Sequence, residues 1–144
     1  MFKRLETFAP RILGVTRVLF GVLMTCHGAQ KTLGVFGGVP PEAPALVVWV
    51  AGSLELVGGA LLALGLWARG TAFVLSGLMA VAYFMGHAPK GFWPILNGGE
   101  LAIAYSWLSL YLAAAGPGAW ALDNRRTRAG QPERAVSREP RLAA

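Results

Sequence analysis

The fold is decided by residues 45–67, ALVVWVAGSLELVGGALLALGLW, a run of 23 residues with a single charged side chain, Glu55. A run of this length and apolarity can cross a lipid bilayer as a helix. A carboxylate near its centre needs compensation from inside the protein, because lipid cannot solvate it. Three small residues share its helix face: Ala51, Gly59 and Ala63. The run therefore predicts a membrane-spanning helix whose acidic face packs closely against another helix.

The composition of the whole chain of 144 residues agrees with a membrane location. Only 14% of its residues are charged, against roughly 25% in a soluble domain, and 55% are hydrophobic. A chain of this length predicts one compact unit. The net charge of +6 is concentrated near the two ends, which is typical of topology signals and argues against nucleic-acid binding. The single cysteine, Cys26, excludes an intrachain disulfide.

Four apolar segments predict membrane-spanning helices, at about residues 11–33, 45–67, 70–87 and 99–116. The last two would reach only roughly 25–27 Å at 1.5 Å per residue, so they need flanking residues or thinner lipid. Arg17 and His27 interrupt the first segment, which favours its retention as a span over its removal as a signal peptide. The predicted fold class is an all-α membrane protein, a four-transmembrane-helix bundle within residues 1–123.

Lysine and arginine residues outside the spans predict the orientation of the bundle. Ten of them fall on one side of the membrane and two, Lys31 and Lys90, on the other. The positive-inside rule then places both termini of this multi-pass protein in the cytoplasm. Residues 124–144 are rich in Arg, Pro and Ala, and they predict a basic, disordered cytoplasmic tail in contact with membrane lipid.

Arg17 lies on a face of small residues in the first segment, as Glu55 does in the second. The two helices are neighbours in the sequence and antiparallel, and an arginine side chain that points toward the membrane centre can reach far along its helix. We therefore predict a buried ion pair between Arg17 and Glu55. The pair can be purely architectural, since breaking such a pair costs about 3–5 kcal/mol. It can also bind a ligand or a proton, as intramembrane ionisable groups often do.

A second polar set is predicted at the outer ends of the spans and consists of His27, Lys31, Tyr83, His87 and Glu100. It is a candidate ligand pocket for a quinone or another amphipathic molecule, with a histidine that bonds a ring oxygen. In the alternative, these side chains only reach toward the lipid headgroups and Glu100 only caps its helix. Neither histidine has a second ligand at a spacing typical of metal sites, so no metal is predicted. Haem is not favoured, because both histidines would have to converge on one point.

These residues belong to an ordered set of short motifs: Arg17-x3-Gly21, His27-Gly28-x2-Lys31, Glu55-x3-Gly59, Leu64-Gly65-x3-Arg69, His87, Gly98-Gly99-Glu100, Gly116-Pro117-Gly118 and Asp123. The set spans residues 11–123 and resembles the DoxX family of small bacterial membrane proteins, which is related to the DoxD subunit of archaeal thiosulfate:quinone oxidoreductase. The resemblance implies a four-helix membrane bundle and, by association, redox work with quinones. It carries over the polar residues Arg17, His27, Lys31, Glu55, His87 and Glu100.

The first function that we predict is a small subunit of a membrane oxidoreductase system with a site for a quinone or a related amphiphile. Other membrane or soluble redox proteins would supply the electrons, because the chain has no cysteine pair and no cofactor motif. The alternative is a non-enzymatic assembly or scaffold protein whose buried pair sets the helix register. A third hypothesis is a small proton-coupled transporter that uses Glu55. Small multidrug exporters also have four helices and one membrane acid, but their acid lies in the first span, whereas Glu55 lies in the second. The catalytic residues, the substrate and the oligomeric state stay open.

Overall fold

The structure of the protein is a computed structural model that describes residues 5–129. Within that range the chain is helical and contains no strand. Its elements are, in order, α2 (Ala9–Leu33), the π-helix η1 (Leu46–Ala51), α3 (Gly52–Leu64), α4 (Ala68–Gly86), the 3₁₀-helix η2 (Ala88–Lys90), α5 (Pro94–Asn97), α6 (Glu100–Ala115) and α7 (Leu122–Ala129). The all-α class predicted from the sequence is confirmed for the described residues.

Three helical stretches are long and apolar enough to cross a membrane: Ala9–Leu33, Leu46–Leu64 and Ala68–Lys90. The fourth predicted span forms α6, whose 16 residues would reach roughly 24 Å along the helix axis. Large apolar side chains cover the outside of the helices and are more than half exposed, among them Leu19, Val57, Phe73 and Trp107. Such a surface suits lipid better than water.

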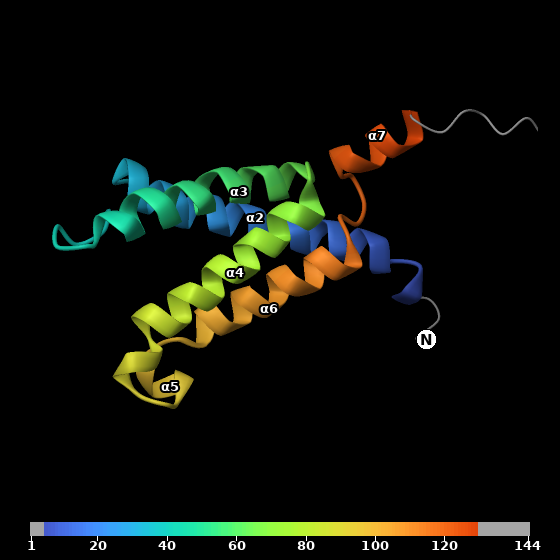
Figure 1. Ribbon diagram of the computed structural model, residues 1–144. Coiled ribbons are helices and arrows are strands. Elements are labelled where there is room, and N and C mark those ends of the chain that lie inside the picture. Colours follow the sequence, from blue (N-terminus) through green and yellow to red (C-terminus); the bar gives the residue numbers. More distant parts are fainter. Residues whose placement is uncertain (1–4, 130–144) are drawn as a thin grey trace, which may run out of the picture.

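The helices pack as two pairs, α2 against α3 and α4 against α6 (Figure 1). Glycines allow α2 and α3 to pack with their backbones close together. A Cβ atom added at Gly21 would lie within 3.0 Å of backbone atoms of Gly59 and Ala63, and one at Gly28 would collide with the backbone at Leu56. Small residues that let two backbones touch are the usual adhesive between membrane helices. The small-residue face predicted around Glu55 therefore does face α2.

Apolar side chains from both pairs fill the space between them near the end that bears α7. Phe20 and Met24 of α2 meet Leu62 of α3 and Leu75 of α4, and all four are almost completely buried. Within the second pair, the hydroxyl of Ser106 on α6 donates a hydrogen bond to the backbone carbonyl of residue 76 on α4. The two pairs diverge from this core toward the other end of the molecule (Figure 1).

A junction of hydrogen bonds ties the ends of the helices together beside α7. The carboxylate of Asp123, in the first turn of α7, accepts hydrogen bonds from the backbone amides of Trp67 and Ala68 at the start of α4, at 2.9 and 2.8 Å. Its own amide donates to the carbonyl of Gly65, which ends α3 in the left-handed region at φ 71°. The amide of Ala119 donates to the carbonyl of Pro10 in α2.

The position of α7 corrects one expectation about the tail. Residues 124–129 were predicted to be disordered, but they belong to the helix α7, which begins at Leu122. An acidic residue in the first turn favours a helix there, and the Asn124 side chain also donates a hydrogen bond to the carbonyl of Gly118. The remainder of the predicted tail, residues 130–144, lies outside the described residues.

Candidate functional site

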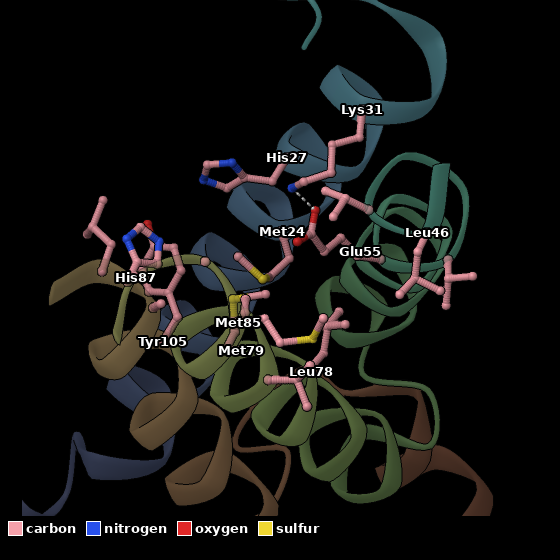
Figure 2. Close-up of a pocket in the computed structure, with 18 of the residues that line it drawn as sticks. Met24, His27, Lys31, Leu46, Glu55, Leu78, Met79, Met85, His87 and Tyr105 are labelled. Atoms are coloured by element: carbon pink, nitrogen blue, oxygen red, sulfur yellow. Dashed lines mark hydrogen bonds and ion pairs between the residues drawn. The ribbon is translucent and has the colours of Figure 1, made fainter. Parts of the chain in front are cut away.

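A cavity of about 620 Å³ lies between the two helix pairs, away from the end that bears α7 (Figure 2). Residues of α2, η1 and α3 line one side of it, and residues of α4 and α6 line the other. Most of the lining is apolar; the polar or ionisable exceptions are His27, Lys31, Glu55, His87 and Tyr105. A cavity of this size and polarity is typical of a site for a small organic molecule.

The π-helix η1 forms part of the cavity wall, where it contributes Leu46, Val47 and Val50. It begins just after Pro44, whose carbonyl accepts hydrogen bonds from the backbone amides of both Val47 and Val48. The wider turn shifts the helix face presented to the cavity relative to that of the α-helix that follows. Single π-turns inside helices are often found at functional sites. From the sequence, this stretch was expected to be a regular α-helix.

Glu55 is paired with Lys31 and not with Arg17. The carboxylate of Glu55 accepts a hydrogen bond from the ammonium group of Lys31 in a buried ion pair at the edge of the cavity (Figure 2). The side chain of Glu55 is 5% exposed and that of Lys31 18%. Gly52 leaves room for the lysine stem, because a Cβ atom there would lie 2.9 Å from the Cβ atom of Lys31. The burial predicted for Glu55 is thus confirmed, whereas its predicted partner is wrong.

The register of the first helix pair explains the correction. The close contact of Gly28 with Leu56 places Glu55 almost level with Gly28, three residues from Lys31. Arg17 is eleven residues from Gly28 along α2, which is roughly 16 Å at 1.5 Å per residue. An arginine side chain cannot cover that distance, so the lysine that comes from the other end of α2 is the partner.

Arg17 is buried as predicted, but its partners are backbone carbonyls. Its guanidinium group donates to the carbonyls of Leu62, at 2.6 Å, and Ala63 in the last turn of α3. It also donates to the carbonyls of Pro117, at 2.7 Å, and Ala119, at 3.3 Å, in the segment between α6 and α7. The last carbonyls of a helix lack partners within it and carry partial negative charge. They therefore stabilise the cation, and the Arg17 side chain belongs to the junction beside α7.

Only part of the predicted outer pocket lines the cavity. His27, Lys31 and His87 do. Tyr83 instead stacks on the His87 ring, with ring centroids 6.5 Å apart and an angle of 16° between the planes. Glu100 is exposed at the start of α6. The role of these residues in binding a ligand stays a prediction.

Two of the ionisable residues that line the cavity, Glu55 and Tyr105, were not assigned to the outer pocket from the sequence. Glu55 was placed deeper in the membrane, with Arg17. Tyr105 gave no polar motif in the sequence, but it lies one helical turn after Leu101 and Ala102, which line the same wall. Its ring meets that of His27 edge to face, with centroids 6.3 Å apart.

His87 is held in place by the short segment between α4 and α6. Its Nδ1 atom lies 3.1 Å from the backbone carbonyl oxygen of Asn97. The buried Asn97 side chain fixes that segment, because its amide group donates to the carbonyl of Gly91 and its oxygen accepts from the amide of Gly99, both at 2.8 Å. The imidazole is thus anchored at one nitrogen while the ring borders the cavity.

The electrostatic character of the cavity is close to neutral, because the charges of Lys31 and Glu55 compensate each other. Among the residues that the structure describes, no group of three or more His, Cys, Asp or Glu side chains could hold a metal ion. Cys26 is free, partly buried and outside the cavity lining. The arrangement suits an uncharged molecule with an apolar body and a few hydrogen-bonding groups.

Fold and cavity together define a helical membrane protein with a ligand-sized apolar cavity between two helix pairs. The chain matches the DoxX family over residues 12–88, more than half of its length, and it belongs to that family. A protein from Haemophilus influenzae, described as an uncharacterized protein, is 44% identical over 128 residues, which cover 84% of this chain and 95% of that protein. No solved structure matches the chain. The resemblance drawn from the ordered motifs is confirmed.

The motifs of the resemblance fall into two spatial groups. Arg17, Gly65, Arg69 and Asp123, together with the 116–118 turn, belong to the junction, where Arg69 donates to two carbonyls in the last turn of α6. The group at the cavity consists of His27, Lys31, Glu55 and His87. The matched range of 12–88 contains all members of the second group. The first group holds the helices together, and the second is the candidate functional site.

Proposed function

We propose that this DoxX-family protein binds a membrane-soluble amphiphile of the quinone type in the cavity, as a small subunit of a membrane-associated oxidoreductase system. The observation that carries the proposal is the cavity itself: about 620 Å³, mostly apolar, and bordered by Lys31, Glu55 and His87. A quinone ring with a short length of isoprenoid tail has the size and polarity that such a lining accepts. The ring oxygens would bond the polar groups, and the tail would lie against the apolar helices.

The proposed topology places the cavity in the outer half of a bacterial cytoplasmic membrane. The three apolar helices and α6 cross the bilayer, and both termini face the cytoplasm. The support is the strong bias of Lys and Arg residues toward the end with the junction, with only Lys31 and Lys90 at the other end. A ligand could then enter sideways from the lipid, between the diverging helix pairs.

The proposed role leaves electron transfer to a partner. The chain has a single cysteine and therefore offers no dithiol that could be oxidised and reduced. A soluble or membrane redox protein would supply the electrons to the bound quinone. Lys31 and Glu55 would then act as the polar groups that hold the ring.

A scaffold function is the second candidate, and one observation favours it. Lys31 and Glu55 satisfy each other, and Arg17 is satisfied by carbonyls, so the buried charges need no ligand. In this case the pair would only fix the register of α2 and α3. The chain would then assemble with another membrane protein through its apolar outer surface.

Extraction of the native ligand separates these functions. The protein is purified with native lipid in successive wash steps, and quinone and phospholipid are measured after each step. The proposed site predicts that quinone remains at about one molecule per chain while phospholipid falls, since a buried drug-sized ligand exchanges more slowly than bulk lipid. A constant ratio of quinone to phospholipid would contradict ligand binding. Quinone-free protein in stoichiometric complex with another membrane protein would support the scaffold.

A further inference from the structure

We infer that the cavity selects a ligand that donates a hydrogen bond to His87, which means a phenol or hydroquinone hydroxyl in preference to a quinone carbonyl. The inference rests on the proposed ligand-binding function and specifies its chemistry. His87 is the specificity-determining residue, and Asn97 positions it. This preference follows from the position of the proton on the imidazole ring of His87.

The hydrogen bond between His87 and Asn97 fixes the position of that proton. A backbone carbonyl only accepts hydrogen bonds, so the Nδ1 atom that lies 3.1 Å from it must be the donor. In a neutral imidazole with a proton on Nδ1, the other nitrogen, Nε2, carries a lone pair and is an acceptor. No carboxylate within residues 5–125 forms an ion pair with His87.

The surroundings hold the ring in this orientation. Asn97 is 5% exposed, and two hydrogen bonds of its side chain, with Gly91 and Gly99, hold its backbone carbonyl in place. Tyr83 lies almost parallel to the imidazole on one face. A flip of the ring would exchange Nδ1 for a carbon atom at the carbonyl and leave that acceptor without its partner. The acceptor at Nε2 is therefore preorganised.

Nε2 is the ring nitrogen that remains for a ligand. No hydrogen bond to it is formed within the described part of the chain, although His87 borders the cavity. Figure 2 shows His87 across the cavity from Glu55 and Lys31. A ligand hydroxyl can donate to this lone pair, whereas a carbonyl oxygen would face it with a lone pair of its own. A site built around one polarity rejects the analogue that lacks the matching group.

The other polar groups do not discriminate in this way. Lys31 and Glu55 together offer both N–H donors and carboxylate acceptors, so either oxidation state of a ring oxygen finds a partner. The nitrogens of His27 have no hydrogen-bond partner among residues 5–125, and its ring can present a donor or an acceptor. The hydroxyl of Tyr105, which also lines the cavity, can donate or accept as well. The selectivity therefore depends on His87.

The direct test is a comparison of three probes that differ only at the ring oxygens. Decylubiquinone, its hydroquinone and the dimethyl ether of that hydroquinone are titrated anaerobically into the full chain in lipid nanodiscs. We expect the hydroquinone to bind roughly tenfold tighter than the other two, as one extra hydrogen bond without an opposing lone pair would give. Equal affinities, or tighter binding of the quinone, would overturn the inference and leave the proposed function intact. No binding of any probe would remove both.

Two variants assign the preference to one side chain. In His87→Gln the side-chain amide offers both a donor and an acceptor, so the ratio of the affinities should fall toward one. Tyr83→Phe is the matched control: it keeps the stacked ring outside the cavity lining and should retain the preference. Retention of the full preference in His87→Gln would contradict the role of His87.

Nuclear magnetic resonance of the wild-type chain tests the tautomer without relying on a variant that must fold. The chain has only two histidines, so ¹⁵N-histidine labelling gives two imidazole spin systems. The system with a protonated Nδ1 and an unprotonated Nε2 is expected for His87, and its assignment follows from its loss in His87→Gln. A proton on Nε2 of His87 would refute the inference, whatever the binding data show.

Discussion

Replacement of Lys31 by methionine is expected to lower the free energy of unfolding by about 3–5 kcal/mol, which is the usual cost of leaving one member of a buried ion pair alone. The carboxylate of Glu55 would lose its ion-pair partner, and it lies near the middle of the second apolar stretch with its side chain only 5% exposed. No other lysine or arginine forms a salt bridge with it within residues 5–125. The structure therefore offers no substitute partner.

Replacement of Glu55 by glutamine should lower the free energy of unfolding by less than Lys31→Met does. In Glu55→Gln the unpaired group is the ammonium of Lys31, which is 18% exposed and belongs to the last turn of α2. A lysine near a helix end can extend toward water or headgroups, and it then avoids most of the desolvation cost. The double variant Lys31→Met/Glu55→Gln removes both charges of this pair and should be closer to wild type in stability than Lys31→Met alone.

Unfolding of the four proteins in the same mixed micelles measures this double-mutant cycle. Lys90→Met is the matched control, because it removes an exposed lysine from the end of η2 and should leave the stability unchanged. Additive effects of the two single changes would show that Lys31 and Glu55 do not interact, and would contradict the pairing.

Arg17→Met should also destabilise the protein severely, by about 3–5 kcal/mol or more, because several carbonyls lose a charged donor at once. The affected carbonyls come from two segments: Leu62 and Ala63 end α3, whereas Pro117 and Ala119 lie between α6 and α7. The change thus loosens the junction from two sides. Arg17→Lys should recover only part of the stability, because an ammonium group cannot reproduce the planar fork of the guanidinium.

Arg11→Met is the control for the general loss of an arginine from α2. Arg11 is exposed, and its guanidinium lies over the Phe8 ring at 5.8 Å, so its removal should cost little. The measurement is thermal unfolding in detergent, together with amide hydrogen exchange at Leu66 and Ala119 in the junction. Equal stability of the Arg17 and Arg11 variants would contradict the structural role assigned to Arg17.

The sequence predicted the helices well because their signals are local. Apolar length, proline and glycine boundaries, and the small residues around Arg17 and Glu55 all act within one segment. They placed the helices within a few residues and indicated that both charges are buried. The correct family also followed from the order of the motifs.

The partners of the buried charges could not be predicted by the same reasoning. The choice between Arg17 and Lys31 depends on the register of α2 against α3. If one helix were shifted by a few residues along the other, a different residue of α2 would lie beside Glu55. The acceptors of Arg17 are backbone carbonyls, and these are present at every position of any sequence. Only the three-dimensional path of the segment around Pro117 shows which carbonyls are free.

The residues that line the outer pocket could likewise be predicted only in part. Tyr83 and His87 were both predicted to belong to the outer pocket, and their rings do stack on each other. The cavity, however, reaches only His87. The contribution of Tyr105 and of the η1 wall depends on how α6 and the first helix pair are oriented, and no local pattern encodes that orientation.

If the cavity between the helix pairs holds a ligand, a large side chain that fills the cavity should block binding. Ala82 lines the cavity on α4, whereas Phe84, two residues later, is 69% exposed on the outer surface. The measurement is titration of the wild-type protein, Ala82→Trp and Phe84→Trp with decylubiquinone in nanodiscs. We expect saturable binding to the wild type and to Phe84→Trp, and binding at least about tenfold weaker to Ala82→Trp. Equal uptake by all three proteins, as simple partitioning into lipid would give, would contradict this expectation.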